Sequence, residues 1–232
     1  MKTVAIIPAA GAGVRMGADR PKQFINIDNK PLLAVTLEKF QECRVIDIII
    51  LVVPESDVAF CEEKIVAPFQ LSKVKKIIAG GLRRQDSVRL GLESTKGEFG
   101  LTLIHDGVRP FVSPYLIEQI VNAAYEYRAV TAAIPAKDTI KEVDKNGLVI
   151  GTFERQLLWQ VQTPQVFRYE DIKSAHRRAA EEDWGEVTDD AFLMEKIGIP
   201  VKVVEGSEKN IKITTKFDIE YAKFLLSRDI EL

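Results

Sequence analysis

Cysteine is scarce in this chain: only Cys43 and Cys61 occur among its 232 residues. Two cysteines are too few for a disulfide scaffold, and their spacing does not match a metal-binding motif. We therefore expect both to be buried, reduced thiols in a cytoplasmic protein.

Long apolar runs are also missing. No segment approaches the roughly 20 apolar residues that a membrane span needs. Met1 and Lys2 lead directly into a strand pattern, without the apolar core of a signal peptide. Charge is nearly balanced, with a formal net charge of −2, which gives no general electrostatic case for nucleic acid. The sequence predicts neither a membrane nor a nucleic-acid partner.

The hydrophobic fraction of 46% is enough for a sizeable core, and the length fits a single domain, 1–232. Strand patterns alternate with helix patterns, which predicts an α/β fold with right-handed crossovers and a parallel sheet core. Strands are predicted at 3–9, 46–53, 74–79, 101–105, 130–135 and 201–205. Helices are predicted at 31–41, 56–66, 86–94, 114–128, 169–182, 188–197 and 216–227.

The pattern changes after Pro135. Residues 139–143 and 148–153 alternate in polarity on either side of a turn over Asp144–Gly147, which predicts a β-hairpin. Such a hairpin is poorly stable alone. We expect the segment 137–154 to project as a β-arm and to pack on another subunit. A surface hairpin folded on its own domain is the alternative.

A glycine-rich segment, Pro8–Gly17, directly follows the first strand. Backbone N–H groups in such a turn can approach a phosphate, and Arg15 and Lys22 add two cations. The segment lacks the Gly-Lys-Ser/Thr ending of a P-loop, and Met16 replaces the third glycine of a dinucleotide-binding turn. An ordinary strand-to-helix turn is the alternative, but the two cations favour a nucleoside triphosphate site.

A second glycine pair, Gly80-Gly81, follows the third strand. Gly81 permits a close approach of a ligand, and Ser87 could present its hydroxyl to a base edge. A plain turn with Asp86 as the helix N-cap is equally compatible with this segment.

The segment His105–Pro110 follows the fourth strand and carries the sharpest signal. A carboxylate at the end of a buried strand, here Asp106, is costly unless it is paired or bound. Asp106 could bind a ribose hydroxyl, a substrate hydroxyl or Mg²⁺, and Arg109 could pair with Asp106 or with a phosphate. His105 should point to the opposite face and act as a core residue. All three loops fall at the carboxyl edge of the sheet, where such folds bind ligands.

Later polar groups are less specific. Thr188 is interpreted first as a helix N-cap, with Asp189 and Asp190 in the first turn. Lys212 lies between Ile211 and Ile213, which favours a solvated edge lysine.

Taken in order, these motifs closely resemble the 2-C-methyl-D-erythritol 4-phosphate cytidylyltransferases of non-mevalonate isoprenoid biosynthesis. The departures are Leu82, where some relatives carry an acid, Val14 and Gly107-Val108. The similarity runs through 8–11, Arg15-Met16, 21–23, 81–88, 105–110, Asp138-Thr139, Arg155, 163–165, Thr188-Asp189 and 210–212.

The resemblance implies a Rossmann-like sheet of the nucleotide-diphospho-sugar transferase type and a homodimer joined through the β-arm. It implies that Arg15, Lys22 and Lys212 surround the reacting phosphates and that Arg155 holds the acceptor phosphate. Thr139 and Arg155 would come from the partner's arm. The implied substrate-binding residues are Ala9, Ala10, Gly11, Gly81 and Ser87 on the cytidine side, and Asp106, Arg109 and Thr139 at the methylerythritol phosphate or ribose.

The implied reaction transfers CMP from CTP to the acceptor phosphate and releases pyrophosphate. Two anions must meet, so the site needs concentrated positive charge and Mg²⁺ or another divalent cation. Two other functions remain open from the sequence. One is a ribitol 5-phosphate cytidylyltransferase, and the other is a non-catalytic regulatory module that binds a nucleotide.

Overall fold

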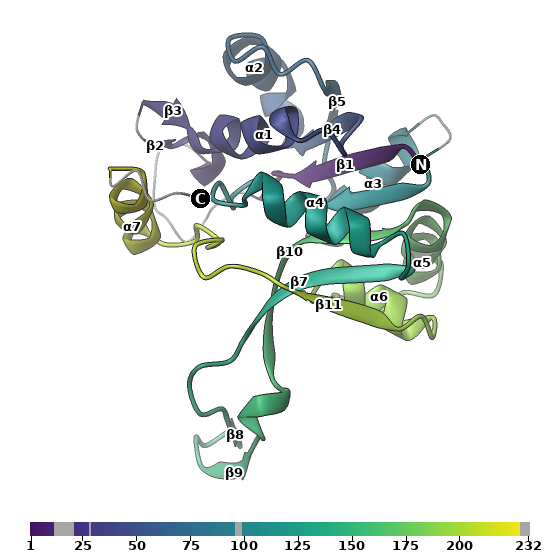
Figure 1. Ribbon diagram of the computed structural model, residues 1–232, viewed down its shortest axis with the longest axis vertical. Coiled ribbons are helices and arrows are strands. Elements are labelled where there is room, and N and C mark those ends of the chain that lie inside the picture. Colours follow the sequence, from purple (N-terminus) through teal and green to yellow (C-terminus); the bar gives the residue numbers. More distant parts are fainter. Residues whose placement is uncertain (12–20, 28, 96–98, 228–232) are drawn as a thin grey trace.

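The computed structural model describes residues 1–11, 21–27, 29–95 and 99–227. A seven-stranded sheet runs through the molecule in the order β11-β7-β10-β6-β1-β4-β5 (Figure 1). Its strands are β1 (Thr3–Pro8), β4 (Ile48–Val53), β5 (Val74–Ala79), β6 (Leu101–Ile104), β7 (Ala129–Pro135), β10 (Trp159–Arg168) and β11 (Val201–Glu205).

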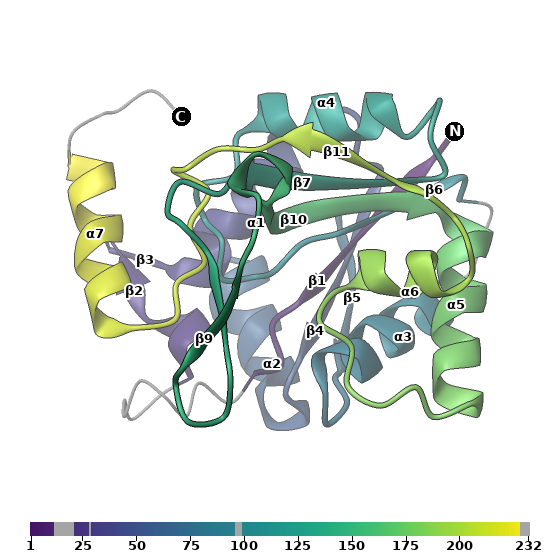
Figure 2. The same cartoon turned by 90° about the horizontal axis from the view of Figure 1, so that it is seen from below.

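Helices cover both faces of the sheet (Figures 1 and 2). Side chains of β1 alternate, so Ala5 and Ile7 enter one core with α1 and α4, while Val4 and Ile6 enter a second core with α3, α5 and α6. The helices are α1 (Leu32–Glu42), α2 (Val58–Cys61), α3 (Arg84–Ser94), α4 (Pro114–Ala123), α5 (Tyr169–Glu181), α6 (Asp190–Lys196) and α7 (Lys216–Ser227).

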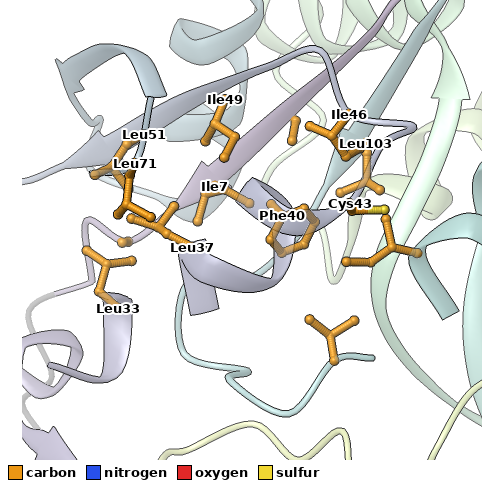
Figure 3. Packing of buried hydrophobic residues seen from close by; sticks show 14 of the residues in the cluster. Ile7, Leu33, Leu37, Phe40, Cys43, Ile46, Ile49, Leu51, Leu71 and Leu103 are labelled. Atoms are coloured by element: carbon orange, nitrogen blue, oxygen red, sulfur yellow. The ribbon is translucent and has the colours of Figure 1, made fainter. Parts of the chain in front are cut away.

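The apolar stripe of α1 shows why this helix packs where it does. Leu33, Leu37 and Phe40 recur at helical spacing and are fully buried against Ile7 and its neighbours (Figure 3). Cys43 and Cys61 are buried free thiols, as expected. Burial raises the pKa of Cys61 to about 12, so this thiol is un-ionised at neutral pH.

The predicted α/β class and parallel core are confirmed, but the short strands β2 (Asn26–Ile27) and β3 (Lys30–Pro31), which form a small sheet of their own, and one strand of the main sheet were not predicted. β10 lies in the middle of the sheet, antiparallel to both β7 and β6. Gln160, Gln162, Gln165 and Pro164 interrupt its apolar pattern, so local periodicity gives no strand signal there. The interruption coincides with a register shift between Val161 and Gln165.

Several predicted boundaries shift by one or two residues, and three differences change how a helix begins, ends or is built. The helix predicted at 56–66 comprises a 3₁₀ turn (Glu55–Asp57), α2 and a π-helical turn (Glu62–Val66). The helix predicted to end at residue 128 stops at Ala123, because the chain must turn before residue 128, whose carbonyl accepts from Arg168 N at 2.9 Å. Thr188 is not an N-cap, because Asp189 caps α6 by accepting from Phe192 N at 3.0 Å.

The predicted hairpin is present as β8 (Lys141–Val143) and β9 (Val149–Thr152), a separate two-stranded sheet. Asp144 Oδ1 accepts from the backbone N–H groups of Asn146 and Leu148, each at 2.9 Å, and Gly147 has a φ of +82°. The hairpin extends away from the main sheet (Figure 1). No helix in the described part of the chain is long and apolar enough to cross a membrane.

Candidate active site

A pocket lies at the carboxyl edge of the sheet, where the loops after β1, β5 and β6 meet. Its volume is about 260 Å³. This is the edge at which sheets of this kind bind ligands. The pocket is lined by Pro8, Ala9, Ala10, Gly11, Lys22, Gln23, Gly81, Leu82, Arg83, Arg84, Ser87, Asp106, Val108 and Lys212.

The β1 loop is fixed at both ends. Ala9 N donates to Val52 O at 2.7 Å, and the buried Gln23 side chain donates to Ala9 O at 2.8 Å. Lys22 begins the 3₁₀ turn Lys22–Phe24 and forms part of the pocket wall. Arg15 lies outside the described residues.

The β5 loop packs directly on the β1 loop. A Cβ added at Gly80 would lie 2.5 Å from the Ala10 Cβ, so a side chain there would separate the two loops. Buried Ser87 accepts from Gly81 N at 3.1 Å, which holds the Gly81 turn against the pocket. The N-cap of α3 is residue 83 and not Asp86, whose carboxylate accepts from the Arg83 N–H at 3.2 Å.

Asp106 is the centre of the charged cluster. Its Oδ1 accepts from Arg84 Nε at 2.9 Å, and its Oδ2 lies 2.9 Å from Lys212 Nζ and 3.6 Å from Arg109 Nε. Burial would raise the pKa of the Asp106 carboxyl, but the charges of Arg84, Lys212 and Arg109 outweigh it and hold the pKa well below its ordinary range. Asp106 is therefore ionised at neutral pH.

Lys212 is exposed, as its local pattern favours, but tertiary contacts also bring its ammonium group to this cluster. The segment that carries it is irregular and is pinned on both sides. The amide of buried Asn210 donates to Thr163 O at 2.8 Å, and Ile213 N donates to Val108 O at 2.9 Å. Arg109 Nη1 donates to Asn210 O at 2.7 Å.

A second cavity lies on the other side of this cluster. Arg84, Asp106 and Lys212 line both cavities and so form the wall between them. The second cavity is also lined by Arg109, Val161, Gln162, Thr163, Gln165, Thr188, Asp189, Phe192 and Glu195.

His105 is a core residue, as predicted. Its Nδ1 lies 3.1 Å from Thr163 Oγ1 and its Nε2 lies 3.1 Å from Arg109 O. Burial lowers the pKa of His105 to about 4, so the imidazole is neutral at pH 7. The ring supports the loop that carries Asp106 and Arg109.

Sequence patterns missed a chain of polar side chains behind Asp106. Arg84 Nη1 donates to Asp190 Oδ2 at 2.7 Å, and Asp190 Oδ1 lies 3.0 Å from His176 Nε2. Asp190 is fully buried, and His176 is nearly so. The only local signal was the pair of adjacent acids at 189–190, which also fits an ordinary helix start.

Thr139 and Arg155 are not brought to the pocket within this chain. Both are exposed in the β-arm segment, and Arg155 donates from Nη1 to Lys137 O at 2.8 Å. A further cavity, lined by Arg109, Lys137, Asp138 and Lys212 among others, lies at the base of the arm.

Magnesium can be tested against the donor set of the pocket. Asp106 is its only carboxylate among the described lining residues, and no group of three potential ligands occurs in the described part of the chain. Mg²⁺ commonly uses one or two carboxylates together with substrate phosphates and water. The described residues are therefore compatible with an ion held mainly by a triphosphate and water, since Asp106 is the one carboxylate that the described lining offers.

The buried carboxylate of Asp190 predicts how the stability of the fold depends on pH. Burial raises the pKa of Asp190, but Arg84 and the His176 hydrogen bond lower it more. A depressed native pKa stabilises the fold above the unfolded value of about 3.9, and this contribution is lost as the pH falls below it. Asp190→Asn should cost about 2 kcal/mol at pH 7. In urea unfolding, the difference in the free energy of unfolding between wild type and Asp190→Asn should shrink below pH about 4. A difference that stays the same at every pH would contradict a depressed pKa for Asp190.

The sheet order, the two apposed glycine turns and the cationic cluster at the carboxyl edge define an α/β nucleotidyltransferase. Residues 3–228 match the family described as 2-C-methyl-D-erythritol 4-phosphate cytidylyltransferase. The chain belongs to this family.

Relatives and solved structures agree with this assignment over nearly the whole chain. The 2-C-methyl-D-erythritol 4-phosphate cytidylyltransferase of Syntrophus aciditrophicus is 45% identical, covering 98% of this chain and 97% of the relative. That of Geobacter metallireducens is 44% identical, covering 99% and 100%. The crystal structure of 4-diphosphocytidyl-2C-methyl-D-erythritol synthase from Anaerococcus prevotii has a TM-score of 0.86 at 34% identity, covering 98% of this chain and 96% of that one.

Proposed function

We propose that the pocket binds CTP and that the neighbouring cavity binds 2-C-methyl-D-erythritol 4-phosphate. As a member of its family, the enzyme transfers CMP to this acceptor and releases pyrophosphate, in the non-mevalonate route to isoprenoid precursors. One observation carries the site assignment. Arg84, Lys212 and Asp106 form a wall that separates two cavities, so a group at that wall can face both substrates.

The nucleotide side uses the two glycine turns. Ala9, Ala10 and Gly11 offer backbone groups to the nucleotide, while Gly81 and Ser87 border the base. Lys22 faces the triphosphate, and Arg15 is proposed for the same role from the sequence. Leu82, a departure from the family pattern, is fully exposed at the pocket rim, and all of the groups assigned above are still present.

The acceptor side uses Arg109, Thr163 and the start of α6 from this chain. We propose that Thr139 and Arg155 reach it from a second copy. The described residues of the β-arm support a homodimer, because a two-stranded hairpin is unstable alone and its apolar side chains are exposed. The exposed apolar side chains of the β-arm are Ile140, Val143, Leu148, Val149, Ile150 and Phe153, and Leu157, Trp159 and Val161 are exposed directly after it.

Catalysis follows from charge and position. The acceptor phosphate oxygen attacks the α-phosphorus of CTP, and the bond to the β-phosphate oxygen breaks to release pyrophosphate. Lys22 and Lys212 stabilise the negative charge that grows during this exchange, and Arg109 and Arg155 hold the acceptor. A Mg²⁺ ion bound to the triphosphate, with Asp106 as its protein ligand, would neutralise further charge. We further propose that this reaction takes place in the cytoplasm.

The base pocket predicts selectivity for CTP. Polar groups matched to one base are left unpaired by another, which makes rejection strong. Pyrophosphate release with ATP or GTP should therefore proceed with a kcat/KM at least about 10²-fold below that with CTP. Comparable use of a purine nucleotide would contradict the assignment of Gly81 and Ser87 to the base.

The same assay tests the acceptor and the other possible functions. With CTP, 2-C-methyl-D-erythritol 4-phosphate should be the preferred acceptor and ribitol 5-phosphate a poor one. Preference for ribitol 5-phosphate would overturn the proposed acceptor. Binding of CTP without turnover of either acceptor would indicate the regulatory module.

A further inference from the structure

Arg84 occupies an unusual place in the site. Its guanidinium lies in the wall shared by the two cavities, yet two of its donors engage carboxylates of the protein. Nε donates to Asp106 at 2.9 Å and Nη1 donates to Asp190 at 2.7 Å. Asp190 lines neither cavity. Arg84 therefore links a carboxylate of the site to one buried behind it.

Asp190 is a rigid anchor for this link. It is fully buried at the start of α6, and its second carboxylate oxygen lies 3.0 Å from His176 on α5. Its own N–H donates to Gln165 Oε1 on β10 at 3.2 Å, and the Ala191 N–H donates to the same oxygen at 3.2 Å. Because α3, α5 and β10 all contribute partners to Asp190, its carboxylate has little freedom to move and holds the Arg84 guanidinium in place.

The two oxygens of Asp106 have different partners. Oδ1 accepts from Arg84, whereas Oδ2 lies 2.9 Å from Lys212 and 3.6 Å from Arg109. Without Arg84, the carboxylate could rotate and engage Lys212 and Arg109 with both oxygens. A stronger ion pair there would hold these two cations back from the negative charge that grows on the phosphates during transfer, which lowers kcat more than substrate binding.

We propose that Arg84, anchored by Asp190 and His176, is a positioning residue that fixes the Asp106 carboxylate and leaves Lys212 and Arg109 available to the phosphates. This inference rests on the proposed function, because it takes Asp106 and Lys212 to face the substrates. In this proposal Arg84 acts through Asp106, by way of its Nε, and not through its Nη2, which is buried without a hydrogen-bond partner among the described residues. A small misplacement of Asp106 lowers the rate of transfer more than the binding of either substrate.

Lysine cannot replace arginine in this position. A guanidinium presents donors in a rigid fork, which here spans two carboxylates, whereas an ammonium is a single point charge. Arg84→Met alone would leave Asp190 as a buried charge with only His176 beside it, and such a variant can fail to fold. The double variant Arg84→Met with Asp190→Asn removes the cation and the buried anion together, which avoids that cost.

The experiment measures kcat and KM for CTP and for 2-C-methyl-D-erythritol 4-phosphate, with unfolding curves, in wild type and in these variants. Asp190→Asn and Arg84→Lys should each lower kcat about tenfold, and the double variant about 10²-fold, with both KM values within about twofold of wild type. Arg89→Met is the matched control. Arg89 lies further along α3, pairs with Glu93 at 2.7 Å and lines neither cavity, so its kcat should be unchanged.

The outcomes separate this inference from the proposed function. A wild-type kcat in folded Asp190→Asn or in the folded double variant overturns the positioning role. A loss of kcat in the Arg84 variants alone, with Asp190→Asn at the wild-type kcat, also overturns it, because Arg84 would then act on the substrate directly. Lys212→Ala tests the proposed function in the same assay. If it is inactive while the Arg84 and Asp190 variants behave as wild type, only the inference on Arg84 fails.

Discussion

Lys22→Ala should lower kcat by about two to three orders of magnitude. Lys22 lies in the wall of the pocket beside Ala9–Gly11, where the triphosphate is proposed to bind. Its charge counts most when the bond to pyrophosphate breaks, because negative charge then grows on the leaving group. Steady-state kinetics with saturating CTP would measure this loss directly.

Folding should not account for the effect. Lys22 is only partly buried and begins a 3₁₀ turn of three residues. The control is Lys30→Ala, which removes an exposed lysine paired with Glu38 at 2.9 Å outside the pocket. Both variants should unfold at the wild-type urea concentration, and only Lys22→Ala should lose turnover. A kcat near that of wild type in Lys22→Ala would remove this residue from the proposed mechanism.

Arg155→Ala should abolish efficient use of the acceptor while leaving the affinity for CTP nearly unchanged. Within the described residues of this chain, the Arg155 side chain is exposed and donates to Lys137 O. An isolated exposed arginine of this kind would contribute little. A large rise in the KM for the acceptor therefore requires that Arg155 reach a site elsewhere. Lys145→Ala, in the hairpin turn, is the control for loss of charge from the arm.

Mixed subunits decide whether that site belongs to a partner. Arg155→Ala and Lys22→Ala subunits should each be strongly impaired, but a heterodimer of the two has one site with both defects and one with neither. Random exchange at equal amounts should restore about a quarter of the wild-type activity. No recovery, once exchange is demonstrated by differently tagged subunits, would show that Arg155 acts within its own chain or not at all.

Some of the site could be predicted because it depends on neighbours in the sequence. The buried run before Pro8 specifies a strand, and the parallel arrangement places the loops at residues 8, 80 and 106 on one edge. Strand alternation correctly assigned His105 to the core, and Asp106, on the opposite face, lines the pocket. The Asp144–Gly147 turn was specified by its own side chains in the same way.

Other parts have no local signature. β10 joins the sheet through pairing with β6 and β7, although its glutamines and Pro164 break the apolar alternation. The local sequence of Lys212 is that of a surface lysine. The side chain reaches the cluster because neighbouring Asn210 is buried and donates to Thr163 O. In the sequence, Arg84 is one of two adjacent basic residues in a turn. Only the folded chain brings Asp106 and Asp190 to its guanidinium.

By itself, then, the amino-acid sequence determined the α/β class, the three loops of the site and the hairpin. In each, the deciding interactions lie within a few residues: apolar periodicity, glycine conformation and turn hydrogen bonds. Only the tertiary structure decided the central antiparallel strand, the place of Lys212 and the link from Asp106 through Arg84 to Asp190. These depend on pairing distant polar groups, because a buried charge or amide must find its partner wherever the folded chain brings one.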